Sequence, residues 1–577
     1  MTGQSIPAMK FLRKKWHLAA SGLLGILMFL AIFGLEPLRY TGIGWTQHGF
    51  GGHDITQHQI GWMFYRNSPW TFPLCKALFL GYPEGTSISY TDSIPLAALF
   101  FKLLSPLLPE NFQYFGLYTC FCFMMQGIFS SALLYLFTKD KLYSTIGSTI
   151  FTAASCFVER CFRHTALSSH WLILAALLLY LIRKRNAQKK HYVLITVLFC
   201  ISLGIHPYLF AMVFAVLTLS EAETFFADPG SRRNSLFFAV CIGAAILFGY
   251  VLGLFGAQIA PVSGYGMYSL NLNAIFNPHS AHHRVWSAYL QNREIFPAQG
   301  DGMYYLGLPM LVLTGIALLT QMVFRFKSFI KVLRRYRWLI FLLAGFTVFA
   351  VSNVVTFDDR IVKIIPLPTQ IQDTLEVFRA SARFFFLPYY CLILFALISL
   401  HRIAKNRRFV TVFCCLITAV LQITEIRPGL RDLHDFFETR YDYIDLSEEW
   451  QLLAQRYHTA KTFDCLTNQS LAFWLAKNNF RTDMMITAPI HMDAYWQQTE
   501  GARDRLRQAL AAGSEKLDPD TIYIISTETG TNRSFSNDSE LESYIESVRT
   551  AYKDRAELKF LTDWVRDYWV LCPLSGS

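Results

Sequence analysis

The chain has 577 residues, of which 53% are hydrophobic and 16% are charged, and its formal net charge is +11. Soluble domains are about one quarter charged, so the composition excludes an ordinary soluble protein, a disordered chain and a collagen-like chain. The positive charge does not indicate nucleic-acid binding, because Lys and Arg cluster in short loops between apolar runs, where they orient spans in a membrane.

The first apolar run covers residues 17–35 and follows a basic segment that holds Lys10, Arg13, Lys14 and Lys15. The run is long, lacks a clear small-residue cleavage site and precedes many further apolar runs. We therefore interpret it as an uncleaved membrane anchor rather than a signal peptide. The basic residues predict that the N-terminus stays in the cytoplasm.

Ten further apolar runs bring the predicted number of transmembrane helices to about eleven. They cover residues 113–137, 142–158, 165–182, 192–204, 206–220, 235–256, 304–324, 338–356, 385–401 and 408–425. Two of them, 192–204 and 206–220, are short, and they are either tilted spans or one long helix. The runs are separated by basic loops at residues 139–141, 183–190, 232–233, 325–337 and 402–408. If all these loops are cytoplasmic, the span count places the C-terminal end outside.

One apolar stretch, residues 94–108, does not fit this alternation. It is about fifteen residues long and begins and ends near Pro95 and Pro109. Runs of this length are more often interfacial or re-entrant than membrane-spanning. We therefore expect it to lie along the outer surface.

The chain becomes polar after residue 425, and helical patterns then alternate with short apolar runs. This alternation predicts a small α/β domain over residues 426–577, outside the membrane. Residues 1–425 form the predicted transmembrane domain, with outer loops at 36–112, 257–303 and 357–384. Cys465 and Cys572 are the only cysteines of the C-terminal domain, and the sequence leaves open whether they form a disulfide or stay as thiols.

Two carboxylates in the first outer loop are candidate catalytic groups. The predicted outer loops are long and rich in polar and aromatic residues, and long ordered loops tend to carry function. Asp54 and Asp92 flank an interfacial segment, where a raised pKa suits a carboxylate to act as a general base. The simpler alternatives are that Asp54 is a turn residue and that Asp92 caps the helix that begins near Ser93.

Arginine and histidine residues of the other outer loops are candidates for binding a phosphate or a substrate. Guanidinium groups bind phosphate with two hydrogen bonds and keep their charge near lipid. The phosphate and substrate candidates are His53, His58, Arg163, His164, His206, Arg379 and Arg383. As alternatives, Arg379 and Arg383 are interfacial anchors and His206 is a hairpin-tip residue before Pro207.

No cofactor is predicted, and a divalent metal is left open. Its ligands would be His53, Asp54 and His58, although their spacing is not a recognised helical ligand pair. The cysteines show no metal-binding spacing either.

Four strings, GGHDITQHQIGW, SYTDSIPL, FRHTALSSHW and FRASARFFFLPYY, are similar to those of a family of uncharacterised bacterial multi-spanning membrane proteins. The order of one span, a long outer loop with an early acid, an interfacial helix and many further spans resembles the GT-C superfamily of polyprenyl-phosphate-dependent membrane glycosyltransferases. The resemblance covers most of residues 10–425. The superfamily's usual adjacent acidic pair is not evident beside Asp92, and the only such pair in the outer loops is Asp358–Asp359.

The resemblance implies an inverting sugar transfer at the outer face of the bacterial inner membrane, from a polyprenyl-phosphate-linked donor to an unknown acceptor hydroxyl. Asp54 falls where the superfamily has its first-loop acid and would be the base, while Asp92 and His164 would orient the acceptor or the sugar. The phosphate would lie near Arg379 and Arg383, among membrane lipids.

Two other functions are weighed against this one. A transporter or flippase of lipid-linked saccharides would place charges at mid-membrane and show internal repeats. Ionisable residues are scarce within the predicted spans and no clear repeat is present, which favours the enzyme. The third function is a non-enzymatic assembly protein of the cell envelope whose C-terminal domain binds a partner.

Overall fold

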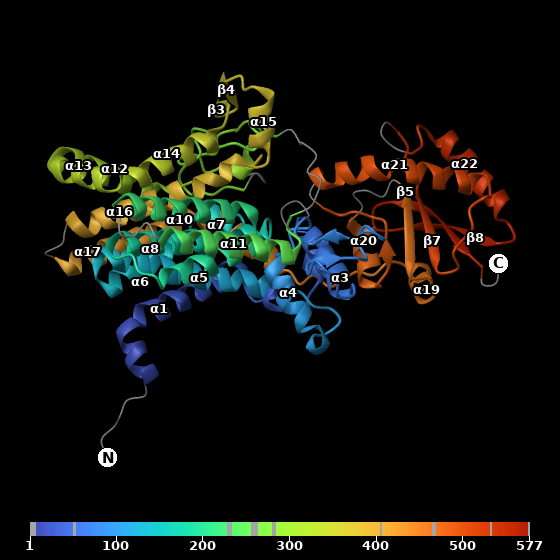
Figure 1. Ribbon diagram of the computed structural model, residues 1–577, viewed down its shortest axis with the longest axis horizontal. Helices are drawn as coiled ribbons and strands as arrows, with labels where there is room; N and C mark the ends of the chain where they lie inside the picture. The colour runs from blue at the N-terminus through green and yellow to red at the C-terminus, as the bar shows by residue number, and fades with distance from the viewer. Residues whose placement is uncertain are drawn as a thin grey trace, which may run out of the picture. The chain divides into compact units, whose positions relative to one another are not determined.

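A computed structural model of the chain describes residues 7–49, 54–227, 234–255, 264–279, 284–403, 407–463, 469–487, 489–530 and 534–574. The fold is mainly helical, with 22 α-helices in these ranges (Figure 1). The chain forms two compact units. The first, here called the helical unit, contains Met1–Tyr40, Tyr114–Phe248 and Ser263–Arg440, and the second, the mixed unit, contains Thr41–Gln113, Gly249–Val262 and Tyr441–Ser577.

A helix forms at each of the eleven predicted spans. These helices are α1 (Pro7–Phe33), α5 (Phe115–Thr138), α6 (Lys141–Thr152), α8 (Trp171–Arg185), α9 (His191–Ile205), α10 (Pro207–Ala227), α11 (Ser235–Leu252), α12 (Leu308–Phe324), α14 (Arg337–Val351), α16 (Phe386–Ile403) and α17 (Arg408–Glu425). Within the described residues, seven helices are long and apolar enough to cross a membrane, and up to eight if the bent pair of α12 and α13 (Phe326–Arg335) is one span. The protein is therefore membrane-embedded, and the count of eleven spans stays a prediction.

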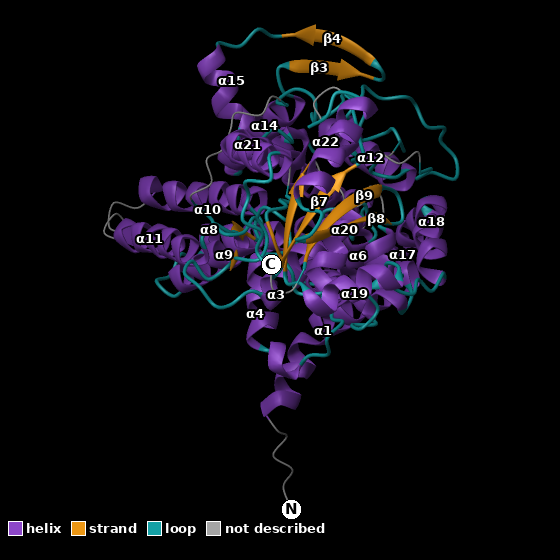
Figure 2. Cartoon of the chain, turned by 90° about the vertical axis from the view of Figure 1, so that its right-hand side faces the viewer, coloured by secondary structure: helices purple, strands orange, loops and turns teal. Residues whose placement is uncertain are grey.

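Several predicted runs end earlier as helices than the hydropathy indicated, and two of them continue as another element. The run 142–158 divides into α6, which ends at Thr152, and the separate short helix α7 (Ser155–Val158). The run 338–356 leaves the helix after Val351, where Ser352 has a φ of +69°. The chain then forms the hairpin of β3 (Val354–Phe357) and β4 (Arg360–Ile364), drawn at the top of Figure 2. Hydropathy measures only the apolar character of a segment, so it does not detect such breaks.

The basic loops of the helical unit meet at one end of the unit. Three contacts illustrate this: Arg408 Nε donates to Asp140 Oδ2 at 2.5 Å, Lys184 Nζ donates to Glu223 Oε2 at 2.6 Å, and Arg325 Nη2 donates to the Arg402 carbonyl at 3.3 Å. At the opposite end, Gln422 donates to the carbonyl of Leu306 at 3.0 Å, and Ser381 donates to the carbonyl of Ala350 at 3.1 Å. The helices that carry these groups thus alternate in direction, as the charge pattern predicted.

The mixed unit is built around a five-stranded sheet of order β6-β5-β7-β9-β8. Its strands are β5 (Thr459–Phe463), β6 (Arg481–Thr482), β7 (Thr521–Ser526), β8 (Ala556–Thr562) and β9 (Asp567–Pro573), shown in orange in Figure 2. β6, β5 and β7 are parallel, whereas β9 is antiparallel to both of its neighbours. The unit also contains α19 (Glu448–Arg456), α20 (Gln469–Lys477), α21 (Pro489–Ala511) and α22 (Asp538–Ala551). Tyr523 and Ile525 of β7 pack in one buried cluster with Ile545 of α22. Cys572 is buried and forms no disulfide with a described cysteine, and Cys465 lies outside the described residues, so the pairing of the two stays open.

The first outer loop belongs to the same unit as this sheet. It forms α2 (Gly44–His48), α3 (Asp54–Asn67), the hairpin of β1 (Lys76–Ala77) and β2 (Thr86–Ser87), and α4 (Pro95–Leu103). Asn67 of α3 donates to the carbonyl of Ala476 in α20 at 3.2 Å, and Leu80 forms an isolated parallel bridge with Thr482 of β6. The loop therefore packs against a segment about 400 residues later, a contact that no local pattern indicates. The stretch 94–108 forms only the short helix α4 and a 3₁₀ turn, Ser105–Leu107.

Candidate functional site

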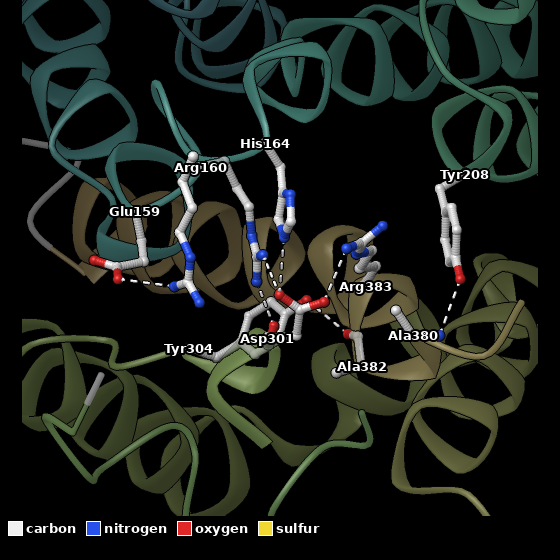
Figure 3. A network of polar contacts seen from close by, with 10 residues as sticks. Glu159, Arg160, His164, Tyr208, Asp301, Tyr304, Ala380, Ala382 and Arg383 are labelled. Atoms are coloured by element: carbon white, nitrogen blue, oxygen red, sulfur yellow. Dashed lines mark hydrogen bonds and ion pairs between the residues drawn. The ribbon is translucent and has the colours of Figure 1, made fainter. Parts of the chain in front are cut away.

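A cluster of ionic groups surrounds Asp301 in the helical unit (Figure 3). Arg160 Nη1 donates to Asp301 Oδ1 at 2.6 Å, and a second nitrogen of Arg160 donates to the Asp301 carbonyl. Arg383 Nη2 donates to Asp301 Oδ2 at 2.8 Å, and His164 Nε2 lies 3.4 Å from Oδ1. The carboxylate therefore joins three segments that are far apart in the sequence.

Short turns rather than long helices position these side chains. Asp301 lies in the 3₁₀ turn Gln299–Gly302, and Arg383 lies in the 3₁₀ turn Ser381–Phe385 that leads into α16. Arg160 lies two residues after the end of α7, where its amide donates to the carbonyl of Phe157 at 3.1 Å. Because Tyr304 Oη also donates to the carbonyl of Ala382 at 2.6 Å (Figure 3), the turn that carries Arg383 is fixed next to the turn that carries Asp301.

The environment of Asp301 keeps its carboxyl group ionised. Burial alone would raise its pKa, but the charges of Arg383 and Arg160 outweigh burial and hold the pKa well below its usual range. The side chain of Arg160 is only 1% exposed, so this guanidinium depends on Asp301 for its counter-charge. A carboxylate with so low a pKa is a poor general base, and Asp301 instead positions the two guanidinium groups.

A second carboxylate, Glu159, binds the neighbouring cations. Arg163 Nη1 lies 3.3 Å from Glu159 Oε1, Arg284 Nη1 donates to Oε2 at 3.0 Å, and Trp286 Nε1 donates to Oε2 at 3.2 Å. Arg163 is therefore bound to Glu159 rather than to Asp301. Within the described residues, four arginines thus share two carboxylates.

Two of the arginine candidates, Arg383 and Arg379, also lie against aromatic rings. The guanidinium of Arg383 lies 4.9 Å from the ring centroid of Tyr208, and that of Arg379 lies 5.4 Å from the ring centroid of Tyr268. Tyr208 Oη also accepts a hydrogen bond from the Ala380 amide at 2.9 Å. His206 lies at the start of α10, where its Nδ1 accepts from the Tyr208 amide at 3.2 Å, as expected for a hairpin-tip residue.

The first-loop candidates lie in the mixed unit. Asp54 is the first residue of α3, and His53 lies outside the described residues. His58, one helical turn after Asp54, is buried, and its Nε2 lies 3.5 Å from Asp92 Oδ2. The residue at the N-cap of α4 is Ile94 rather than Asp92. The alternative in which Asp92 caps this helix is therefore wrong, because Asp92 has a φ of +56° and turns its carboxylate toward His58.

Close packing at Gly61 of α3 holds this pair together. Ser93 Oγ donates to the carbonyl of His58 at 2.7 Å, and a Cβ at Gly61 would lie 2.1 Å from Thr91 Oγ1 and 2.5 Å from Ser93 Oγ. Only glycine allows α3 to approach the turn that carries Asp92 so closely.

Replacing Gly61 by Ala is expected to destabilise the mixed unit by about 1–3 kcal/mol, because a methyl group would overpack this contact. Thermal unfolding of the detergent-solubilised protein measures the effect. Gly243→Ala is the matched control, because no atom lies within 4 Å of the Cβ that it would add. Equal melting temperatures for the two variants would contradict the packing argument.

The structure brings some of the predicted site residues together and separates others. His164 and Arg383 meet at Asp301, and His58 meets Asp92, whereas Arg163, Arg379 and His206 make other contacts. Asp54, His58 and Asp92 belong to the mixed unit, and the arginine candidates belong to the helical unit. The sequence placed Arg160 and Asp301 among the polar residues of the outer loops but assigned no role to them, and it did not single out Glu159. The available signal was the charged pair Glu159–Arg160 between two apolar runs.

In the ranges that the structure describes, no three His, Cys, Asp or Glu side chains are grouped so that they could hold a metal ion. The predicted set of His53, Asp54 and His58 includes a residue outside these ranges, so it stays a prediction.

The chain matches a family described as a domain of unknown function, DUF6311, over residues 22–427. It belongs to the DUF6311 family. No curated protein matches the chain. The DUF6311 segment ends two residues after α17, so it contains every candidate site residue from His53 to Arg383 and excludes the strands of the five-stranded sheet. Both the Asp301 cluster and the His58–Asp92 pair are therefore part of the DUF6311 segment.

Proposed function

We propose that this DUF6311 protein is a membrane glycosyltransferase of GT-C type, which transfers a sugar from a polyprenyl-phosphate carrier to an acceptor hydroxyl. The observation that carries the proposal is the gathering of four guanidinium groups around Asp301 and Glu159. A carrier phosphate lies at the membrane boundary, and guanidinium groups bind phosphate there without losing their charge.

The cluster combines fixed and accessible cations. The side chain of Arg160 is 1% exposed and holds Asp301 in place, whereas the side chains of Arg383 and His164 are 12% and 21% exposed. Arg379 is half-buried over the ring of Tyr268. The accessible groups suit the binding of a phosphate, and the buried ones set their positions.

Asp54 is the proposed base. Its carboxylate takes the proton of the acceptor hydroxyl as the acceptor oxygen attacks the anomeric carbon. The bond between that carbon and the phosphate oxygen breaks, and the polyprenyl phosphate leaves with the electron pair. One bond forms on the face opposite the one that breaks, so the anomeric configuration inverts. Asp92 and His164 orient the acceptor or the sugar. The proposed reaction includes no step on a metal ion.

The proposal places this reaction at the outer face of the bacterial inner membrane, in a chain with eleven spans. The meeting of the basic loops at one end of the helical unit supports this topology. Alkaline phosphatase fused after Gln188 is expected to be inactive, and the same enzyme fused after Arg440 is expected to be active. Equal activity at both positions would contradict the proposed sidedness.

The function is tested with the full chain in lipid nanodiscs and in vesicles, using a labelled polyprenyl-phosphate sugar. Conversion of the donor to free carrier is expected. Movement of intact donor across the vesicle membrane without conversion would overturn the enzyme and favour the flippase. A requirement for residues 430–577 in the cell, with no conversion and with Asp54 dispensable, would favour the assembly protein.

Arg379→Gln is expected to lower kcat/KM for the donor about 10- to 100-fold, because it removes a charged hydrogen-bond donor to the phosphate. Within the described residues, Arg383 forms an ion pair with Asp301, whereas Arg379 forms no ion pair. The substitution of Arg379 therefore breaks no such pair in the resting protein. Arg360→Gln is the matched control, since Arg360 lies in the same outer loop and its side chain is 88% exposed. Equal kinetics of the two variants would remove Arg379 from phosphate binding.

A further inference from the structure

The helix α13 lies between two of the predicted spans, and nothing in the proposed function uses it. It follows α12 after a single residue and is bent from it by 109°. α14 begins two residues after its end. Because α12 is apolar and crosses the membrane in the proposed topology, a helix nearly perpendicular to it runs along the membrane surface.

The sequence of α13 divides its surface into two faces. The apolar residues Phe326, Phe329, Ile330 and Leu333 recur at intervals of three and four positions, which places them on one face of the helix. Lys327, Lys331, Arg334 and Arg335 lie on the other face. No residue of α13 is fully buried by the protein. On the apolar face Phe326 is 55% exposed, and the other three residues are half-buried.

The charges carried by α13 and the residues that flank it in the sequence have a single sign. Residues Arg325–Arg337 hold six basic residues and no acidic one: Arg325, Lys327, Lys331, Arg334, Arg335 and Arg337. In the part of the chain that the structure describes, none of the six forms an ion pair with a carboxylate. Lys184, at the end of α8, lies with Nζ 5.8 Å from the ring centroid of Tyr336, but its charge is paired with Glu223.

We propose that α13 is an interfacial helix that binds the anionic headgroups of glycerophospholipids in the leaflet at the basic end of the helical unit. Its apolar face enters the boundary between headgroups and acyl chains, and its basic face contacts the lipid phosphates. A second copy of the chain is a poor occupant of this face, because it would bring six more cations against the first six. The helix thereby anchors the adjoining ends of α12 and α14 at the surface of this leaflet.

The test measures lipid binding to the full chain in detergent by native mass spectrometry, with phosphatidylglycerol and phosphatidylcholine as probes. The wild type is expected to bind phosphatidylglycerol about tenfold more tightly than phosphatidylcholine, because each cation near the headgroups contributes attraction. Exchange of four cations of α13 for Gln, in the variant K327Q/K331Q/R334Q/R335Q, is expected to abolish the preference.

The matched control removes four exposed cations elsewhere, in the variant R360Q/K363Q/R427Q/R431Q. It lowers the net charge equally and is expected to keep the preference. An equal loss of the preference in both variants would overturn the proposal, because the net charge alone would then explain the binding. A preference retained by the α13 variant would also overturn the proposal.

A second measurement reports on the apolar face. Benzoylphenylalanine at Phe329 is expected to crosslink to lipid acyl chains in nanodiscs, and the same group at Lys331 is expected not to do so. Crosslinking of position 329 to a second copy of the chain, or to another protein, would show that protein covers this face and would overturn the proposal.

Discussion

Asp301→Asn is expected to lower the free energy of unfolding by about 3–5 kcal/mol, because it leaves two guanidinium groups without their counter-charge in a buried site. Arg160 is the more sensitive partner, since its side chain is 1% exposed and contacts both the carboxylate and the carbonyl of Asp301. Thermal unfolding in detergent, followed by circular dichroism, measures the loss. Amide exchange in the turns that carry Arg160 and Arg383 is expected to increase.

The same carboxylate predicts how stability depends on pH. Its pKa in the folded protein is depressed, so its contribution to stability is fully present above the pKa of an unfolded Asp, about 4. The contribution is lost as the pH falls below that value, toward the folded pKa. The wild type is therefore expected to lose stability between about pH 5 and pH 2, and Asp301→Asn is expected to lose less over that range.

Asp359→Asn is the matched control for Asp301. The side chain of Asp359 is 63% exposed and lies 3.9 Å from Arg360, and a surface pair of this kind contributes about 0–1 kcal/mol. The control is expected to melt like the wild type. If Asp301→Asn also melted like the wild type, the two guanidinium groups would not depend on Asp301, and the described cluster would not be a structural unit.

Asp54→Asn is expected to lower sugar transfer by about 10²- to 10⁴-fold, because it replaces the proposed general base by a group that cannot accept the proton. Asn is nearly isosteric with Asp, so binding of the donor to the arginine residues is expected to remain. Rates are measured in nanodiscs with the labelled donor, and donor binding is measured separately with the acceptor omitted.

The control for Asp54 is Asp373→Asn, which changes an exposed carboxylate of another outer loop and is expected to leave the rate unchanged. Asp92→Asn is a second comparison for Asp54, because it removes the carboxylate that faces His58 and leaves the Asp54 side chain unchanged. Near-full transfer by a well-folded Asp54→Asn variant would exclude Asp54 as the base. Loss of donor binding together with the rate would indicate that Asp54 binds the donor instead.

The sequence by itself determined where the helices of the helical unit form. An apolar run of about twenty residues is a local property, and in a membrane only a helix satisfies its own backbone hydrogen bonds. The position of each basic loop is equally local, so the alternation of helix direction followed from the charge pattern. Helix ends were less predictable, as at Ser352, because they depend on the backbone conformation of single residues.

Only the tertiary structure decided which polar groups meet. Arg160 and Asp301 are 141 positions apart, and Arg383 lies 82 positions beyond Asp301, yet one carboxylate binds both arginines. The tertiary structure also decided that the first outer loop packs with the C-terminal sheet, and that Asp92 faces His58 rather than capping a helix. Such contacts depend on how turns and helix ends pack against one another, and the spacing of residues along the chain does not record that packing.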